Sequence, residues 1–244
     1  MSGKGKNAID MTGGSLWKNI LVFSLPLMMT QMLEVLFNLS DVAIAGKYAD
    51  YIALGAVGST ALLVSLFTGI LIGMGAGVNV RTAHQLGAEK TSGSSETVAR
   101  TVYSGLIVCL IIGIILCLVC NIFARPMLET LKTKDELIES AVLYLKIYAL
   151  GMPAMAVYNF GNGVLSACGE TKKPLVYLSI AGVLNVILNI FFVVVCKKAA
   201  DGVAIASVIA QYLSASMIMC HLLKRKDSCK LRLSNKYFDT SACG

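Results

Sequence analysis

The stretch that decides the fold is Leu16–Gly46, LWKNILVFSLPLMMTQMLEVLFNLSDVAIAG. Its apolar part is long enough to cross a bilayer, which takes about 20 residues. Helical spacing places four polar side chains along one face of this helix: Gln31, Glu34, Asn38 and Asp41. A carboxylate that faces lipid at a helix centre costs about 2.5 to 3.5 kcal/mol. We therefore expect this face to line a cavity or an ion pathway.

Composition predicts an integral membrane protein. Of the 244 residues, 56% are hydrophobic and 14% are charged, whereas about a quarter of the residues in soluble domains are charged. The mean hydropathy is +0.73. The net charge is +7, but the basic residues lie in short polar connections and near the C-terminus, without interleaved aromatics. This placement suits a lipid bilayer as the partner and does not indicate nucleic-acid binding.

Six apolar segments are long enough to span a membrane, and continuous apolar runs favour helices over barrel strands. They are the opening helix and the segments near 53–80, 102–124, 141–167, 175–196 and 203–220. We therefore expect an all-α membrane protein with a six-helix lobe over 16–223. With the N-terminus inside, fourteen Lys and Arg residues lie on the cytoplasmic side and six on the outer side. The positive-inside rule then places the tail 1–15 and the basic tail 224–244 in the cytoplasm of a plasma-membrane protein.

Two prolines predict helix kinks, because proline removes a backbone hydrogen bond: Pro26 in the opening helix and Pro153 in the segment 141–167. Around Pro153 several polar and soft side chains fall near one helix face. This face is either a helix–helix seam or a cavity wall suited to varied ligands. Its candidate residues are Tyr148, Met155, Asn159 and Asn162.

Glycine spacing in the second segment predicts close helix packing. Gly69, Gly73 and Gly77 lie four residues apart and would let another backbone approach this face. The polar stretch 81–100 that follows reads as a loop. Cysteines within or beside the apolar segments, Cys168 among them, are expected to behave as small hydrophobes.

No motif indicates catalysis. The sequence contains no phosphate-binding glycine loop, no zinc-protease motif, no nucleophile elbow and no pair of histidines at ligand spacing. We therefore expect neither an enzyme nor a bound cofactor, and no metal beyond a transported cation.

Six stretches resemble the multidrug and toxic compound extrusion (MATE) family of secondary transporters. They are WKNILVFSLPLMMTQ, LFNLSDVAIAG, ALGAVGST, QLGAEK, YNFGNGVLSACGETKKPL and LNVILN. They follow the family order, and the resemblance covers 15–239. It implies the N-terminal six-helix lobe of a twelve-helix transporter whose two lobes are related by a pseudo-two-fold axis. The chain ends near the point where the family's linker between the lobes begins.

The resemblance also implies a cation site. The family's acidic residue matches Asp41, its fifth-helix polar residues match Asn185 and Asn189, and its sixth-helix hydroxyl matches Ser207. One carboxylate, two amide carbonyls and a hydroxyl suit a hard cation such as Na⁺. The same carboxylate, removed from water, can instead carry a proton. Glu34 stands where the family usually has a neutral polar residue.

The function implied is antiport, in which Na⁺ or H⁺ is exchanged for an organic, cationic and amphipathic compound. Two alternatives remain open at this point. One is a flippase of lipid-linked oligosaccharides, whose cavity would carry more Arg and Lys. The other is a non-transporting half-length membrane fragment or an assembly partner, for example of a second six-helix lobe.

Overall fold

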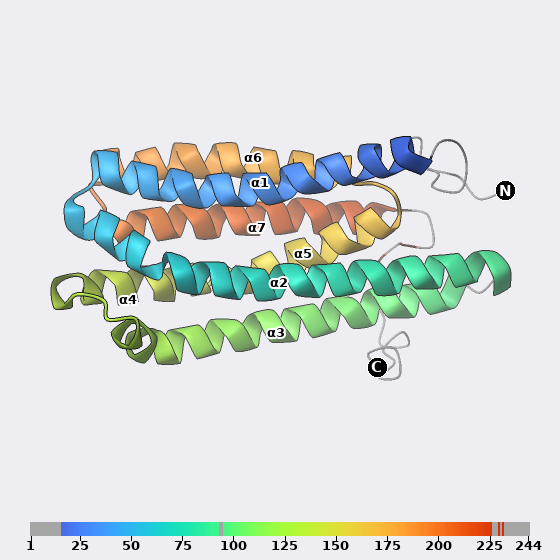
Figure 1. Cartoon of the computed structure of the whole chain (residues 1–244), viewed down its shortest axis with the longest axis horizontal. Coiled ribbons are helices and arrows are strands. Elements are labelled where there is room, and N and C mark those ends of the chain that lie inside the picture. Colours follow the sequence, from blue (N-terminus) through green and yellow to red (C-terminus); the bar gives the residue numbers. More distant parts are fainter. Residues whose placement is uncertain (1–15, 93–94, 226–228, 230, 232–244) are drawn as a thin grey trace.

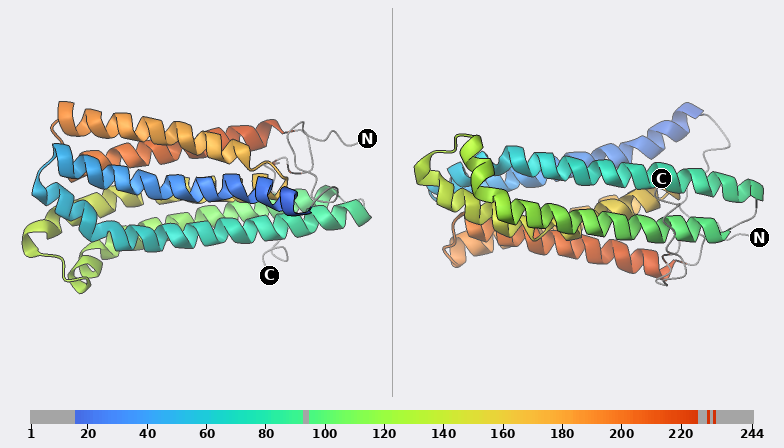
Figure 2. Two further views of the ribbon diagram at one scale, coloured as in Figure 1. Left: turned by 45° about the horizontal axis from the view of Figure 1, so that its top comes forward. Right: turned by 90° about the horizontal axis from the view of Figure 1, so that it is seen from below.

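A computed structural model describes residues 16–92, 95–225, 229 and 231. Throughout these ranges the regular structure is helical, and no strand occurs in them. The predicted tails, 1–15 and most of 224–244, lie outside the described residues. The helices run roughly along one direction and form a single bundle (Figures 1 and 2).

Among the described residues, seven α-helices and one π-helical turn make up the bundle. Their bounds are α1 Leu16–Tyr48, α2 Tyr51–Ser92, α3 Ser95–Thr130, α4 Asp135–Ala149, α5 Met152–Ala167, α6 Lys172–Ile190, the π-turn η1 Phe191–Val195, and α7 Ala200–Lys224. Helices are the form expected in lipid, because they satisfy every backbone polar group within one segment. α1 continues through Pro26 without interruption, and the kink predicted there stays a prediction.

Six membrane spans follow from these helices. Within the described residues, five helices are long and apolar enough to cross a bilayer, and α4 and α5 form a pair bent by 45° that passes the same criteria together. Counting this pair as one span gives six, in agreement with the sequence-based prediction. The bend lies at Leu150 and Gly151, and Pro153 is the second residue of α5. Proline is tolerated there because the first turn of a helix has no partner for its N–H group.

The predicted loop 81–100 is almost entirely helical. α2 continues to Ser92 and α3 begins at Ser95, so residues 93 and 94 alone separate them. At about 1.5 Å per residue, the 42 residues of α2 are roughly twice as long as the hydrocarbon core is thick. The polar end of α2 therefore extends beyond the apolar layer, and its Ala, Gln, Leu and Glu residues favour the helix.

The helices pack in a definite order around the bundle. α2 contacts α5, α3 and α4, while α6 lies between α1 and α7. In Figure 1, α1, α6 and α7 form one side of the bundle and α2 and α3 the other. The start of α1 and the end of α7 lie at the same end, as an even number of spans requires.

The predicted glycine packing face is wrong. A Cβ on Gly69, Gly73 or Gly77 would meet no atom within 4 Å, and these glycines are exposed on the surface of the lobe. The close approach is instead made by Gly75, on another face of α2, and by Gly163 of α5. A Cβ on Gly163 would lie 2.3 Å from the carbonyl oxygen of Gly75. Spacing alone identified small residues but not the direction of the partner helix.

We predict that Gly163→Ala destabilises the protein and that Gly73→Ala does not. The added methyl at residue 163 would press on the backbone of α2, and overpacking typically costs about 1 to 3 kcal/mol. The methyl at residue 73 meets open space, while alanine improves helix propensity by up to about 1 kcal/mol. Apparent melting temperatures of both variants in detergent test this. Equal melting temperatures would contradict the close contact between α2 and α5.

An ion cluster connects the turn between α5 and α6 to the end of α7. Glu170 is only 7% exposed, and its carboxylate lies 2.8 Å from Lys173 Nζ, 3.3 Å from Arg225 Nη1 and 3.5 Å from His221 Nε2. Burial alone would raise the pKa of Glu170, but the hydrogen bond and charge of Lys173 and the charge of Arg225 outweigh it. The pKa of Glu170 therefore lies below its ordinary value.

A disulfide joins the same two parts of the chain. Cys168 at the end of α5 is bonded to Cys229, which lies beyond α7. The expectation that Cys168 behaves as a free apolar residue is therefore wrong. Its partner lies outside the apolar segments, in a part of the chain that returns to the bundle, where Leu231 N–H donates to Leu222 O.

We predict that Glu170→Gln lowers stability near neutral pH by about 1.5 to 3 kcal/mol, as expected for lost hydrogen bonds to a charged group. Because the pKa is lowered on folding, the contribution of Glu170 is present above its ordinary value of 4.5 and disappears as pH falls below it. The melting-temperature difference between wild type and variant should therefore vanish in acid. A difference that grows in acid would contradict this assignment, and Glu129→Gln, at an exposed ion pair, is the control.

Candidate functional site

The four residues predicted to hold a cation form one hydrogen-bonded cluster. Asn189 Nδ2 donates to Asp41 Oδ1 at 2.7 Å, and Ser207 Oγ donates to Asp41 Oδ2 at 2.7 Å. Asn189 Nδ2 also lies 3.2 Å from Asn185 Oδ1, and Asn185 Nδ2 donates to Ser207 Oγ at 3.1 Å. All four residues are buried. The cluster is thus continuous and is drawn from three helices.

Helix packing explains why these residues meet. Asp41 lies two turns before the end of α1, and Ser207 lies two turns after the start of α7. Asn185 and Asn189 are one turn apart on α6, which contacts both α1 and α7. The π-turn η1 begins at Phe191, directly after this pair. Such turns often occur at functional sites, because they change the direction in which neighbouring side chains point.

No basic side chain among the described residues pairs with the carboxyl group of Asp41. It is 2% exposed, and no Lys, Arg or His among the described residues forms an ion pair with it. Its two oxygens accept hydrogen bonds from neutral groups only. Removing an ion from water costs several kcal/mol even after the protein relaxes. The site therefore favours a bound cation or proton.

One further oxygen in the cluster lacks a partner. Asn189 Oδ1 is buried and accepts no hydrogen bond from the described residues. Buried acceptors without a donor are rare, and each calls for a specific explanation such as an ion or water. The carboxylate of Asp41, this carbonyl oxygen and the hydroxyl of Ser207 together fit a small hard cation. No group of His, Cys, Asp and Glu in the described residues suits a transition metal.

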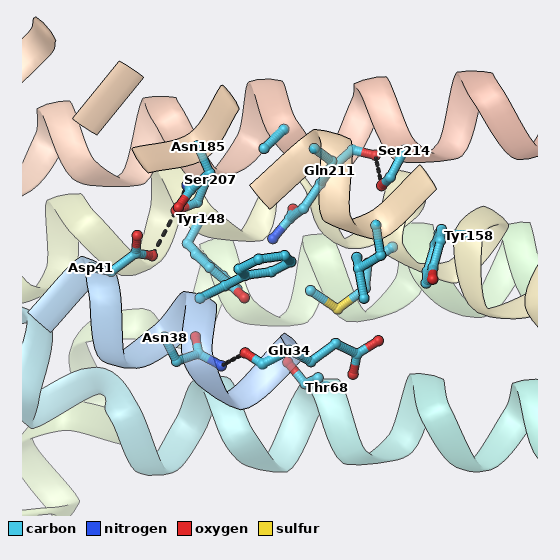
Figure 3. A pocket seen from close by; sticks show the side chains of 15 residues that line it. Glu34, Asn38, Asp41, Thr68, Tyr148, Tyr158, Asn185, Ser207, Gln211 and Ser214 are labelled. Carbon is cyan, nitrogen blue, oxygen red and sulfur yellow. Dashed lines mark hydrogen bonds between the residues drawn. The ribbon is translucent and has the colours of Figure 1, made fainter. Parts of the chain in front are cut away.

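A cavity of about 70 Å³ opens beside the cluster (Figure 3). It is lined by Glu34, Phe37, Asn38, Asp41, Thr68, Tyr148, Met155, Tyr158, Leu178, Ala181, Asn185, Ser207, Ala210, Gln211 and Ser214. These residues come from α1, α2, α4, α5, α6 and α7, so the cavity lies inside the bundle. Pockets for drug-sized ligands measure roughly 300 to 1,000 Å³, and this cavity therefore has room for an ion and a few waters.

The predicted cavity residues divide into two groups. Glu34, Asn38, Tyr148 and Met155 line the cavity. Gln31, Asn159 and Asn162 do not line it. Gln31 is exposed on the lobe surface, Asn159 Nδ2 donates to Met155 O at 3.0 Å, and Asn162 Oδ1 accepts from Ser166 Oγ at 3.4 Å.

The packing of α5 and the geometry of α1 explain why Asn159, Asn162 and Gln31 do not line the cavity. Asn159 and Asn162 lie on the part of α5 that packs against α2, where the backbone of Asn159 meets Gly75. For these two residues, the helix–helix seam considered as the alternative describes the geometry better than a cavity wall. Gln31 lies ten residues before Asp41, too far around α1 to share its direction.

Sequence reasoning missed four polar residues that line the cavity. Gln211 and Ser214 follow Ser207 at spacings of four and seven, and this helical repeat was a usable signal. Tyr158 lies ten residues after Tyr148 and across the bend between α4 and α5, so a straight-helix projection does not relate the two. Thr68 is an isolated hydroxyl in an apolar stretch, and no pattern indicates its role.

Solved structures support the same fold. The lobe superimposes on an outward-facing multidrug resistance MATE family transporter with a TM-score of 0.83 at 22% identity, covering 97% of this chain and 51% of that one. A MATE protein in a bent conformation gives a TM-score of 0.81 at 22% identity, covering 90% of this chain and 50% of that one.

Sequence comparison shows the family. A probable multidrug resistance protein YpnP of Bacillus subtilis is 27% identical over 221 residues, which cover 90% of this chain and 48% of that protein. A probable multidrug resistance protein NorM of Thermotoga maritima is 24% identical, covering 86% and 45%. The chain spans about half the length of the curated relatives it matches. The MatE family model matches residues 26–191, and the chain therefore belongs to the MatE family.

Proposed function

We propose that this lobe belongs to a secondary antiporter that exports organic, cationic and amphipathic compounds in exchange for Na⁺ or H⁺. The observation that carries the proposal is the buried carboxylate of Asp41, which accepts hydrogen bonds from two neutral side chains and forms no ion pair with a described basic residue. A permanent structural carboxylate in a membrane protein normally has a basic partner. A carboxylate without one suits a cation that binds and leaves.

The ligand set favours Na⁺ as the coupling cation. Besides the two oxygens of Asp41, the cluster holds the unpartnered Asn189 Oδ1, and a proton would leave that acceptor unused. Hard cations are bound by carboxylate and carbonyl oxygens of this kind, and backbone carbonyl oxygens coordinate Na⁺ in transporters. Binding requires the amide groups to turn their oxygens inward, which breaks the bonds from Asn189 and Asn185 to their present acceptors.

The charge of the cavity supports a cationic cargo. Among the described residues that line it, two are acidic, Asp41 and Glu34, and none is basic. An oligosaccharide flippase would need Arg or Lys here for an anionic headgroup, and nothing in the lining favours that alternative. The relatives named as multidrug resistance proteins are about twice as long. We infer that a second six-helix lobe supplies the other wall of the cargo site, and that the lobes rock about it.

We predict that Na⁺ raises the thermal stability of the purified chain and that Asp41→Asn abolishes this response. A ligand that binds only the folded state stabilises it, by about 2.7 kcal/mol when its concentration is one hundred times Kd. The asparagine keeps the shape of the side chain but removes the charge. Melting temperatures are measured in detergent at constant ionic strength, with choline replacing Na⁺.

Asp135→Asn is the matched control, because Asp135 is exposed at the start of α4 and lies far along the chain from the cluster. It should keep the full Na⁺ response. Identical responses in wild type and Asp41→Asn would contradict the proposed site. In a full-length transporter, the same substitution should abolish coupled export while the protein still reaches the membrane.

A further inference from the structure

Glu34 places a second carboxylate in the cavity of Asp41. The two residues lie seven positions apart on α1, which is two helical turns, so they share a face. Both line the cavity. In Figure 3 the side chain of Glu34 extends away from Asp41, so its carboxylate lies in a different part of the cavity from the cation cluster.

The two carboxylates have opposite surroundings. Each oxygen of Asp41 accepts a short hydrogen bond from a neutral side chain. Glu34 Oε2 is also buried, but no described group donates a hydrogen bond to it. The nearby amide of Asn38 donates instead to the backbone oxygen of Glu34, at 3.2 Å. The protein thus prepares donors for a charged Asp41 and none for this oxygen of Glu34.

No basic side chain lies among the described residues that line the cavity around Glu34. The titratable groups that share the cavity are Asp41 of α1, Tyr148 of α4 and Tyr158 of α5. The hydroxyl of Tyr158 already donates to Pro174 O at 3.1 Å. The lining residues from α2, α6 and α7 are neutral, and none of the lining side chains is basic. Two unbalanced negative charges in one small cavity repel strongly, because the medium there screens them poorly.

We propose that Glu34 is a proton-binding site, separate from the cation site at Asp41. A proton taken from water converts the carboxylate to a neutral acid with an O–H donor. Another lining acceptor, Gln211 Oε1, is also buried without a donor, and a protonated Glu34 adds an O–H donor to the cavity. A metal ion needs a shell of oxygen ligands, which Asn185, Asn189 and Ser207 can provide next to Asp41. A proton on Glu34 needs no such shell.

The lobe then carries two different cations, Na⁺ at Asp41 and H⁺ at Glu34. This inference rests on the proposed function only in assigning the other cation to Asp41. Its consequence is that cargo exchange would be driven by both gradients and that one lobe could release two positive charges inward.

Infrared spectroscopy of the purified chain in lipid nanodiscs tests the proposal. At pH 7 the difference spectrum between wild type and Glu34→Gln should show loss of one carboxylic-acid C=O band, which shifts in D₂O. Glu34→Asp should move this band without removing it, which also covers the case that Glu34→Gln fails to fold. Glu129→Gln, at an exposed glutamate, should instead lose the two bands of an ionised carboxylate.

Each outcome separates this inference from the proposed function. Loss of ionised-carboxylate bands in Glu34→Gln would overturn the proton site, as would an acid band in Asp41→Asn that disappears when Na⁺ is added. Asp41→Asn should keep the Glu34 band and lose the Na⁺ effect on melting, while Glu34→Gln should do the reverse. A wild type that shows the acid band but no Na⁺ effect would overturn the proposed function alone.

Discussion

The structure depends on the buried carboxylate of Asp41 and on how it is compensated. In a lipid-facing bundle, a charge of this kind is stable only where neighbouring helices supply polar partners. α6 supplies Asn185 and Asn189, and α7 supplies Ser207. The hydrogen bonds therefore connect three helices at one depth. They satisfy the hydrogen-bonding capacity of the carboxylate without neutralising its charge, and this is the reason for proposing that a cation binds there.

Contacts elsewhere in the bundle fix the positions of the helices that surround this site. α2 and α5 pack backbone to backbone at Gly75 and Gly163, and both helices contribute residues to the cavity lining. The 45° bend between α4 and α5 brings Tyr148 and Tyr158 to the same cavity. At the other end of the bundle, the cluster around Glu170 connects the start of α6 to the end of α7.

Much of the fold was predictable, because membrane spans are strong signals. Long apolar runs indicated six spans, and bilayer energetics indicated that Asp41 and Glu34 would face the interior. The direction in which each helix face points was harder to predict from the sequence. The expected spacing is present at Gly69, Gly73 and Gly77, but these glycines point away from any described partner. Asn159 lies in the interface between α5 and α2. Thr68 and the partner of Cys168 were not predictable, since both depend on segments brought together only by the folded bundle.

The most direct test of the account is equilibrium binding of radioactive sodium to the purified chain. We expect one saturable site per chain, weakened as pH falls because protons compete for Asp41, and absent in Asp41→Asn. The proposed ligands Asp41, Asn185, Asn189 and Ser207 all belong to this lobe, so binding should not require a second lobe. Absence of saturable binding in the wild type, or binding that persists unchanged in Asp41→Asn, would contradict the central claim.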